Sequence, residues 1–194
     1  MKNILIILAI IFPIFANAGI YTNTNFRPYI GVSGGMNIMD YTMDIDLDDV
    51  YYSATINTGA RIGSNFGAEL FFSQSSTNNL EYVYDLTAIN HEIYYMIFGF
   101  DIYGYYNITH DINFFTSFGV ANYKLYDKTT YISPTAETSE KQSDNNVSTR
   151  LGIGLMYTFP GDNVSGILRY NYTPLGNELI HNMSEFTVGV RYTF

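Results

Sequence analysis

Hydrophobic and polar residues alternate along most of the chain with the two-residue period of a β-strand. The alternation is clearest near the C-terminal end, where every second residue from Phe186 to Phe194 is apolar. The same pattern recurs, in places more loosely, in seven other segments: 30–38, 52–62, 66–72, 94–102, 114–120, 147–157 and 164–172. The chain is therefore predicted to form eight strands, and no helical period accompanies them.

The connections between the predicted strands alternate between short and long. The short ones, 63–65, 107–111 and 160–163, are built mostly from the turn-forming residues Gly, Pro, Asn and Asp. The long ones are largely polar and cover 39–50, 75–90, 125–146 and 174–183. We therefore expect a sheet with tight hairpins at one end and long loops at the other.

The first residues have the pattern of a secretory signal peptide. Lys2 supplies the positive charge, residues 4–15 form an apolar core, and Ala16-Asn17-Ala18 provides a small-x-small cleavage site. The core of about 12 residues is too short for a membrane-spanning helix, which needs about 20. We expect residues 1–18 to be removed, leaving residues 19–194 as one exported domain.

Alternation by itself does not distinguish a soluble β-sandwich from a barrel that spans a membrane. Eight strands present roughly 40 apolar side chains, more than the interior of an eight-stranded barrel can hold. The opposite row is mostly Gly, Ser, Thr and Asn, whereas a soluble sheet would expose many charged residues. The prediction is an all-β fold, an eight-stranded antiparallel transmembrane β-barrel with its apolar row toward lipid.

Tyrosines concentrate near the ends of the predicted strands, where aromatic girdles of membrane barrels lie. An amphipathic ring is stable at the level of the lipid headgroups, although Tyr is also common in strands generally. The residues expected in the girdles are Tyr51, Tyr52, Tyr94, Tyr95, Tyr103, Tyr105, Tyr106, Tyr123, Tyr126, Tyr170 and Tyr172.

The last eight residues, Thr187–Phe194, resemble the C-terminal assembly signal of Gram-negative outer-membrane barrels, with Gly189, Tyr192 and Phe194 at its motif positions. Residues 27–35 and 113–120 are similar to strands one and five of the opacity-type, OmpA-like and OmpX-like small surface barrels. The resemblance implies a location in the cell outer membrane, with extracellular loops and both termini in the periplasm. It also implies insertion by the outer-membrane assembly machinery and contact with outer-membrane lipid and lipopolysaccharide.

Members of that family serve in adhesion, host interaction or envelope integrity, and seldom in catalysis. Asp and Glu residues gather in three of the long loops, so the protein is expected to display acidic loops. By the resemblance it is expected to act through a host surface ligand or as a structural component, and not to be an enzyme. The alternatives are a small channel and an outer-leaflet lipid-modifying enzyme, similar to a lipid A deacylase or acyltransferase.

Seven charged residues fall on the polar row of the strands and are expected to point into the barrel. Four cations and three anions nearly neutralise one another, which favours a plug of ion pairs over an open pore. Arg61 and Glu69 stand four positions either side of Asn65 and are expected to face each other across the hairpin. We also expect Arg191 and Asp101 toward the tight-hairpin end, and Arg150 and Glu185 toward the loop end. The set is Arg61, Glu69, Asp101, Arg150, Arg169, Glu185 and Arg191.

The formal net charge of −9 argues against a nucleic-acid partner, and the absence of Cys excludes disulfides and thiolate metal sites. The acidic run Asp44–Asp49 is of the kind that binds calcium. An EF-hand counted from Asp44 would however need Gly in place of Asp49 and Glu in place of Thr55. A solvated acidic loop is the better interpretation, and no metal or cofactor is predicted.

The three histidines are the candidate catalytic groups. His110 lies in a short turn, whereas His91 and His181 lie near the loop ends of strands. Only His181 has a Ser and an acid nearby, Ser184 and Glu185, but positions three apart on a strand face opposite sides. No catalytic residue is predicted.

Overall fold

A computed structural model describes residues 26–42, 49–84, 87–132, 137–161, 163–176 and 180–194. The expected signal peptide, 1–18, and most of the acidic run, 44–48, lie outside the described residues. Within the described residues, no helix is long and apolar enough to cross a membrane.

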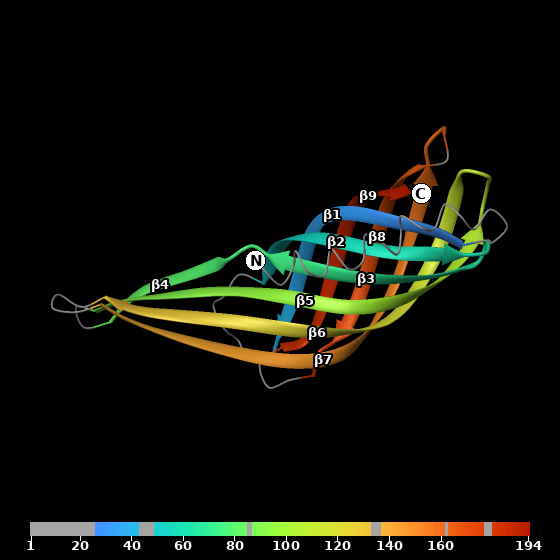
Figure 1. Ribbon diagram of the computed structural model, residues 1–194. Helices are drawn as coiled ribbons and strands as arrows, with labels where there is room; N and C mark the ends of the chain where they lie inside the picture. The colour runs from blue at the N-terminus through green and yellow to red at the C-terminus, as the bar shows by residue number, and fades with distance from the viewer. Residues whose placement is uncertain (1–25, 43–48, 85–86, 133–136, 162, 177–179) are drawn as a thin grey trace.

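The described residues form antiparallel strands that close into a barrel (Figure 1). β1 pairs with β2 on one side and with β9 on the other, and β3 closes the ring by pairing with β5. Since β3 and β4 follow each other along the same partner, β5, the strands occupy eight positions around the barrel. The predicted fold class is confirmed. The strands are β1 Phe26–Tyr41, β2 Val50–Ile62, β3 Phe66–Ser75, β4 Asn78–Tyr84, β5 Thr87–Asn107, β6 Ile112–Ile132, β7 Glu137–Thr158, β8 Val164–Pro174 and β9 Ile180–Thr193.

Between β3 and β4 the chain leaves the barrel wall: β3 pairs with both β2 and β5, whereas the described residues of β4 pair with β5 only. The backbone N–H of Ser76 donates to the carbonyl of Tyr52 over 2.6 Å, and the N–H of Tyr52 donates to Ser76 Oγ over 3.2 Å. These two bonds join the beginning of β2 to the segment between β3 and β4. Beyond it, β4 pairs with β5 alone in the described part of the chain.

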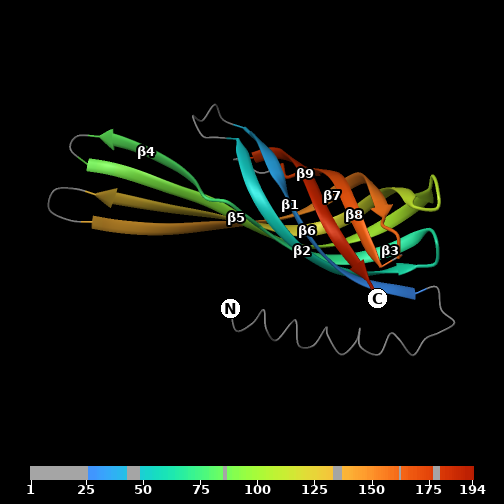
Figure 2. The same cartoon turned by 90° about the horizontal axis from the view of Figure 1, so that it is seen from above.

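A four-stranded sheet continues beyond the barrel, and we call residues 78–84, 87–94, 125–132 and 137–144 the projecting sheet. Figures 1 and 2 show it as two long hairpins that extend past the ends of β1, β2, β8 and β9. Pairing along it is continuous, from Tyr94↔Tyr126 outward to Ala88↔Ile132. The expectation of loops over 75–90 and 125–146 is therefore wrong for most of both segments. A sheet with polar residues on both faces lacks the alternation that identifies a strand.

The apolar row of the strands faces outward around the barrel, as predicted. Val188 is 65% exposed and its neighbours Thr187 and Gly189 on β9 are less exposed than it is. On β6 and β7 the apolar surface ends close to the projecting sheet, because Asn122 follows Val120 and Asn145 follows Val147 at the outward positions. The continuous apolar surface around the barrel matches the band that contacts lipid in a membrane.

Several of the expected girdle tyrosines lie inside the barrel instead. Tyr52 and Tyr106 are each 69% exposed and Tyr172 also faces outward, in agreement with a girdle. Successive strand residues point to opposite faces, so adjacent tyrosines cannot share one surface. The girdle assignment is wrong for Tyr51, Tyr95, Tyr103, Tyr105 and Tyr123, which are buried.

Candidate functional site

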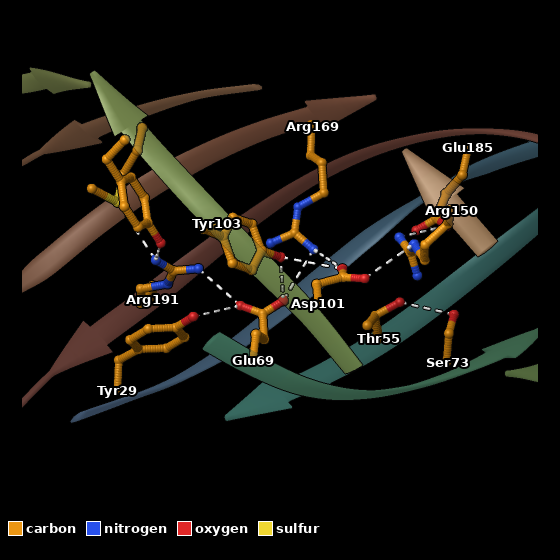
Figure 3. Close-up of polar contacts among 12 residues, drawn as sticks. Tyr29, Thr55, Glu69, Ser73, Asp101, Tyr103, Arg150, Arg169, Glu185 and Arg191 are labelled. Atoms are coloured by element: carbon orange, nitrogen blue, oxygen red, sulfur yellow. Dashed lines mark hydrogen bonds and ion pairs between the residues drawn. The ribbon is translucent and has the colours of Figure 1, made fainter. Parts of the chain in front are cut away.

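Glu69 lies at the centre of a buried network in the barrel interior (Figure 3). Arg169 Nη1 lies 3.0 Å from its Oε1, and Arg191 Nη2 lies 2.9 Å from its Oε2. The hydroxyls of Tyr103 and Tyr29 also donate to the carboxylate, over 2.9 and 3.1 Å. One carboxylate therefore holds together β1, β3, β5, β8 and β9.

A second carboxylate, Asp101, connects the Glu69 group to another arginine. Asp101 lies 3.9 Å from Arg169 Nη1 and 3.7 Å from Arg150 Nε. Arg150 Nη2 lies 3.3 Å from Glu185 Oε2, and its guanidinium stacks over the ring of Phe71 at 4.2 Å. Asp101 therefore lies between the Arg150–Glu185 pair and the Arg169–Glu69 pair.

The buried charges balance. Three cations, Arg150, Arg169 and Arg191, are matched by the three anions Glu69, Asp101 and Glu185, and each is at most 6% exposed. Charges this far from water are stable only when they are paired, so the network acts as one unit. Six of the seven residues expected in the lumen thus meet in one cluster.

The seventh residue, Arg61, lies outside the cluster, and its expected pairing with Glu69 is wrong. The hairpin turns at residues 63–65, with Gly63 at a φ of 67°, and Ile62 pairs with Phe66. The centre is therefore Ser64, so that Arg61 faces Gly67 and Glu69 faces Gly59. The prediction took Asn65 as the centre of the hairpin, which is one residue too far along the chain and therefore gives the wrong β2–β3 register.

Two aromatic clusters that the sequence did not predict lie along the interior. The cluster away from the short hairpins contains Met39, Tyr51, Phe71, Tyr95, Ile97, Ala121, Tyr123, Leu175, Ile180 and Met183. The cluster nearer the short hairpins contains Tyr103, Tyr105, Phe115, Met156 and Ile167. The clusters could have been predicted from pairs of adjacent aromatic residues, such as Phe71-Phe72, Tyr94-Tyr95 and Phe114-Phe115. In a strand, one ring of every such pair must point inward.

The projecting sheet carries charged and aromatic contacts on its surfaces. On one face, Lys128 Nζ lies 3.0 Å from Glu92 Oε2, and the rings of Tyr94 and Tyr126 stack 4.8 Å apart. The ammonium of Lys124 lies 4.9 Å from the centre of the Tyr126 ring. Such a face is suited to water and to polar partners, not to hydrocarbon.

The opposite face of the projecting sheet carries a histidine. His91 Nδ1 lies 3.0 Å from Thr129 Oγ1 and 3.4 Å from Asp127 Oδ1. The described residues contain no group of three or more His, Cys, Asp or Glu side chains placed to hold a metal ion.

The projecting sheet has two open edges. In the described part of the chain, β4 pairs only with β5, and residues 137–145 of β7 pair only with β6. Strand edges of this kind present rows of backbone N–H and C=O groups that another chain can pair with. Both edges lie on the projecting sheet, outside the barrel wall.

The local arrangement considered for catalysis does not assemble. His181 is exposed, whereas Glu185 is buried against Arg150. The hydroxyl of Ser184 lies 3.2 Å from that of Tyr170. The three residues do not form the hydrogen-bonded series that a serine hydrolase requires.

The C-terminal residues that resemble an assembly signal lie on β9 and directly after it. Tyr192 and Phe194 are 45% and 59% exposed, and their rings meet edge to face at 5.2 Å. Gly189 lies opposite Ser33 in the β1–β9 pair. The two rings belong to the outward apolar surface of the barrel.

A family model described as outer membrane protein beta-barrel domain matches residues 5–194. The chain belongs to this family. The match agrees with the closed antiparallel barrel and its outward apolar surface, and it makes the protein an outer-membrane barrel protein.

Solved structures show the same fold. Ail, the attachment invasion locus protein of Yersinia pestis, crystallised with the heparin analogue sucrose octasulfate, is 17% identical with a TM-score of 0.56, covering 87% of this chain and 97% of its own. Neisserial surface protein A is 13% identical with a TM-score of 0.55, covering 88% and 98%. A major outer membrane protein from Thermus thermophilus is 13% identical with a TM-score of 0.59, covering 86% and 99%. No curated protein sequence matches the chain.

Proposed function

We propose that this outer-membrane barrel is a surface attachment protein that binds a protein ligand through the projecting sheet. The observation that carries the proposal is the continuation of β4, β5, β6 and β7 beyond the apolar surface, with two open strand edges. A sheet whose strands are already paired displays a binding surface at a lower entropic cost than loops that must become ordered on binding.

The orientation that we propose places the projecting sheet outside the cell and the short hairpins and both termini in the periplasm. Removal of residues 1–18 and recognition of Gly189, Tyr192 and Phe194 by the outer-membrane assembly machinery complete the proposed route. Lipid and lipopolysaccharide then surround the apolar surface. The catalytic alternative has less support because His181, Ser184 and Glu185 do not meet.

The charge of the projecting sheet favours a protein over a polyanionic glycan. The structure with sucrose octasulfate shows that Ail binds a heparin analogue. In this chain the described part of the sheet and its border carry Glu92, Asp127, Glu140 and Asp144 beside Lys124, Lys128 and Lys141. An excess of acid repels sulfated sugars, whereas strand addition through backbone groups needs no basic patch.

The experiment removes the projecting sheet and keeps the barrel. Lys128 pairs with Lys141 and Leu80 pairs with His91, so residues 128–141 and 80–91 can each be replaced by an Asn-Gly hairpin turn in register. Attachment to epithelial cells and to immobilised host matrix proteins is measured in a non-adherent bacterium that expresses either form. We expect the shortened form to lose attachment and to keep the heat-modifiable gel migration of a folded barrel.

A substitution of Ser64 to Ala in a short hairpin serves as the control and should leave attachment unchanged. Equal attachment by the full and shortened forms, or none by the full form, would contradict the proposal. In the latter case, increased detergent sensitivity of cells that lack the protein would support an envelope role instead.

A further inference from the structure

A cavity of about 540 Å³ opens at the end of the barrel that carries the short hairpins. We call it the hairpin-end vestibule. Arg27, Arg61 and Arg191 line it, together with neutral hydrogen-bonding side chains that include Asn113, Ser165 and Thr193. The volume falls within the range of small-molecule sites in proteins. No Asp or Glu is among the described residues that line it.

Two of the arginines face each other directly. In the β1–β2 pair, Arg27 lies opposite Arg61, on the row of positions that faces the interior. Like charges at directly opposed positions of an antiparallel pair destabilise the sheet. A pair of this kind is stabilised by an anion that lies between the two groups.

The protein itself supplies no side-chain anion for this pair within the described residues. There, neither Arg27 nor Arg61 forms an ion pair with a carboxylate. Arg61 is instead held by neutral acceptors, the carbonyl of Ser64 and the side-chain oxygens of Asn107 and Asn113, the latter two at 3.1 Å. These bonds, and a stack over the Tyr105 ring at 4.6 Å, fix its position at the cavity wall.

The network above the vestibule cannot neutralise the pair either. Arg191 forms the inner wall, but it is committed to Glu69 at 2.9 Å. Because the three buried anions of the network are already matched by three buried cations, Arg27 and Arg61 remain as two uncompensated charges at the cavity among the described residues.

We propose that the hairpin-end vestibule binds a small anion with two or more acidic groups, a phosphate or a carboxylate, through Arg27 and Arg61. A guanidinium presents a planar set of N–H donors that matches a phosphate or a carboxylate. Two guanidiniums on neighbouring strands can therefore bind one anion from two sides. In the orientation proposed above, the vestibule opens to the periplasm, and that placement rests on the proposed function. Binding itself does not depend on it.

The test is isothermal titration calorimetry of the folded full chain in detergent, with inorganic pyrophosphate in one arm and succinate in the other. We expect at least one probe to bind, and its affinity to fall as salt is raised. Arg27→Gln should weaken binding by about tenfold or more, since a charge-assisted contact is lost. The probe that binds more tightly identifies the phosphate or the carboxylate class.

Arg27 is exposed and is the preferred variant, since Arg61→Gln also removes contacts between hairpins. Lys128→Gln on the projecting sheet removes the same charge far from the cavity and should change the affinity by less than about twofold. The proposal is overturned if neither probe binds, or if Arg27→Gln binds as the parent does. Because the shortened form without the projecting sheet retains the vestibule, loss of attachment and loss of anion binding are separable results.

Discussion

Arg191 on β9 and Glu69 on β3 lie 2.9 Å apart in the centre of the barrel, although 122 positions separate them in the sequence. Arg169 shares the same carboxylate from β8 at 3.0 Å. The contact joins strands on opposite sides of the ring, so it can form only when the barrel has closed. The polar interior therefore reports on completed closure, whereas pairing between neighbouring strands does not.

Loss of the central carboxylate should be costly. Glu69→Gln leaves Arg169 and Arg191 buried without their shared anion, and we expect the free energy of unfolding to fall by about 3 kcal/mol. Urea-dependent loss of the compact gel band in lipid vesicles measures it. The matched control is Glu92→Gln, which removes a partly exposed ion pair with Lys128 and should cost about 1 kcal/mol or less. Equal effects of the two substitutions would contradict a cooperative interior network.

The interior should not conduct ions steadily. The charge network and two aromatic clusters fill the lumen between the ends of the barrel in the described residues. Eight strands leave room for side chains but for no wide aqueous channel. Planar bilayer recordings of the purified protein should therefore show no large, stable conductance, with a larger porin as the positive control. A persistent open level would favour the small-channel alternative.

The orientation in the membrane can be tested with single cysteines, because the chain contains none. Thr138 is exposed on the projecting sheet and Ser64 lies in a short hairpin. A maleimide on a polyethylene glycol chain too large for porins should label Thr138→Cys on intact cells and should not label Ser64→Cys. After the cells are lysed, both should react. Labelling restricted to Ser64→Cys on intact cells would mean that the barrel is inserted the other way round.

The C-terminal aromatic residue should matter more for assembly in the cell than for the stability of the barrel. Removal of Phe194 deletes an exposed ring, so the purified chain should still refold in detergent. If the resemblance to an assembly signal is correct, the same variant should accumulate unfolded in cells, as seen by the fraction with folded gel migration. Phe66→Ala removes another exposed ring at the same end of the barrel and should assemble normally. Normal assembly without Phe194 would show that the assembly machinery does not recognise the terminal residue.

The positions of the barrel strands follow from local pattern, and the positions of the polar partners do not. Alternation identified β8 and β9 because one of their faces meets lipid, and that environment selects the residue at every second position. The projecting sheet carries polar residues on both faces, so β4 and the outer half of β7 lack this alternation. Their pairing became evident only from their continuity with β5 and β6.

By itself the sequence determined the fold class and the outward apolar surface, but its set of charged lumen residues lacked Arg27, which also lies on the interior row. The tertiary structure decided which of these charges meet. A shift by one residue at the hairpin centre separates Arg61 from Glu69 and places Arg61 opposite Gly67. The partners of Glu69 come from β8 and β9 across the ring, and closure of the barrel, not sequence spacing, brings them together.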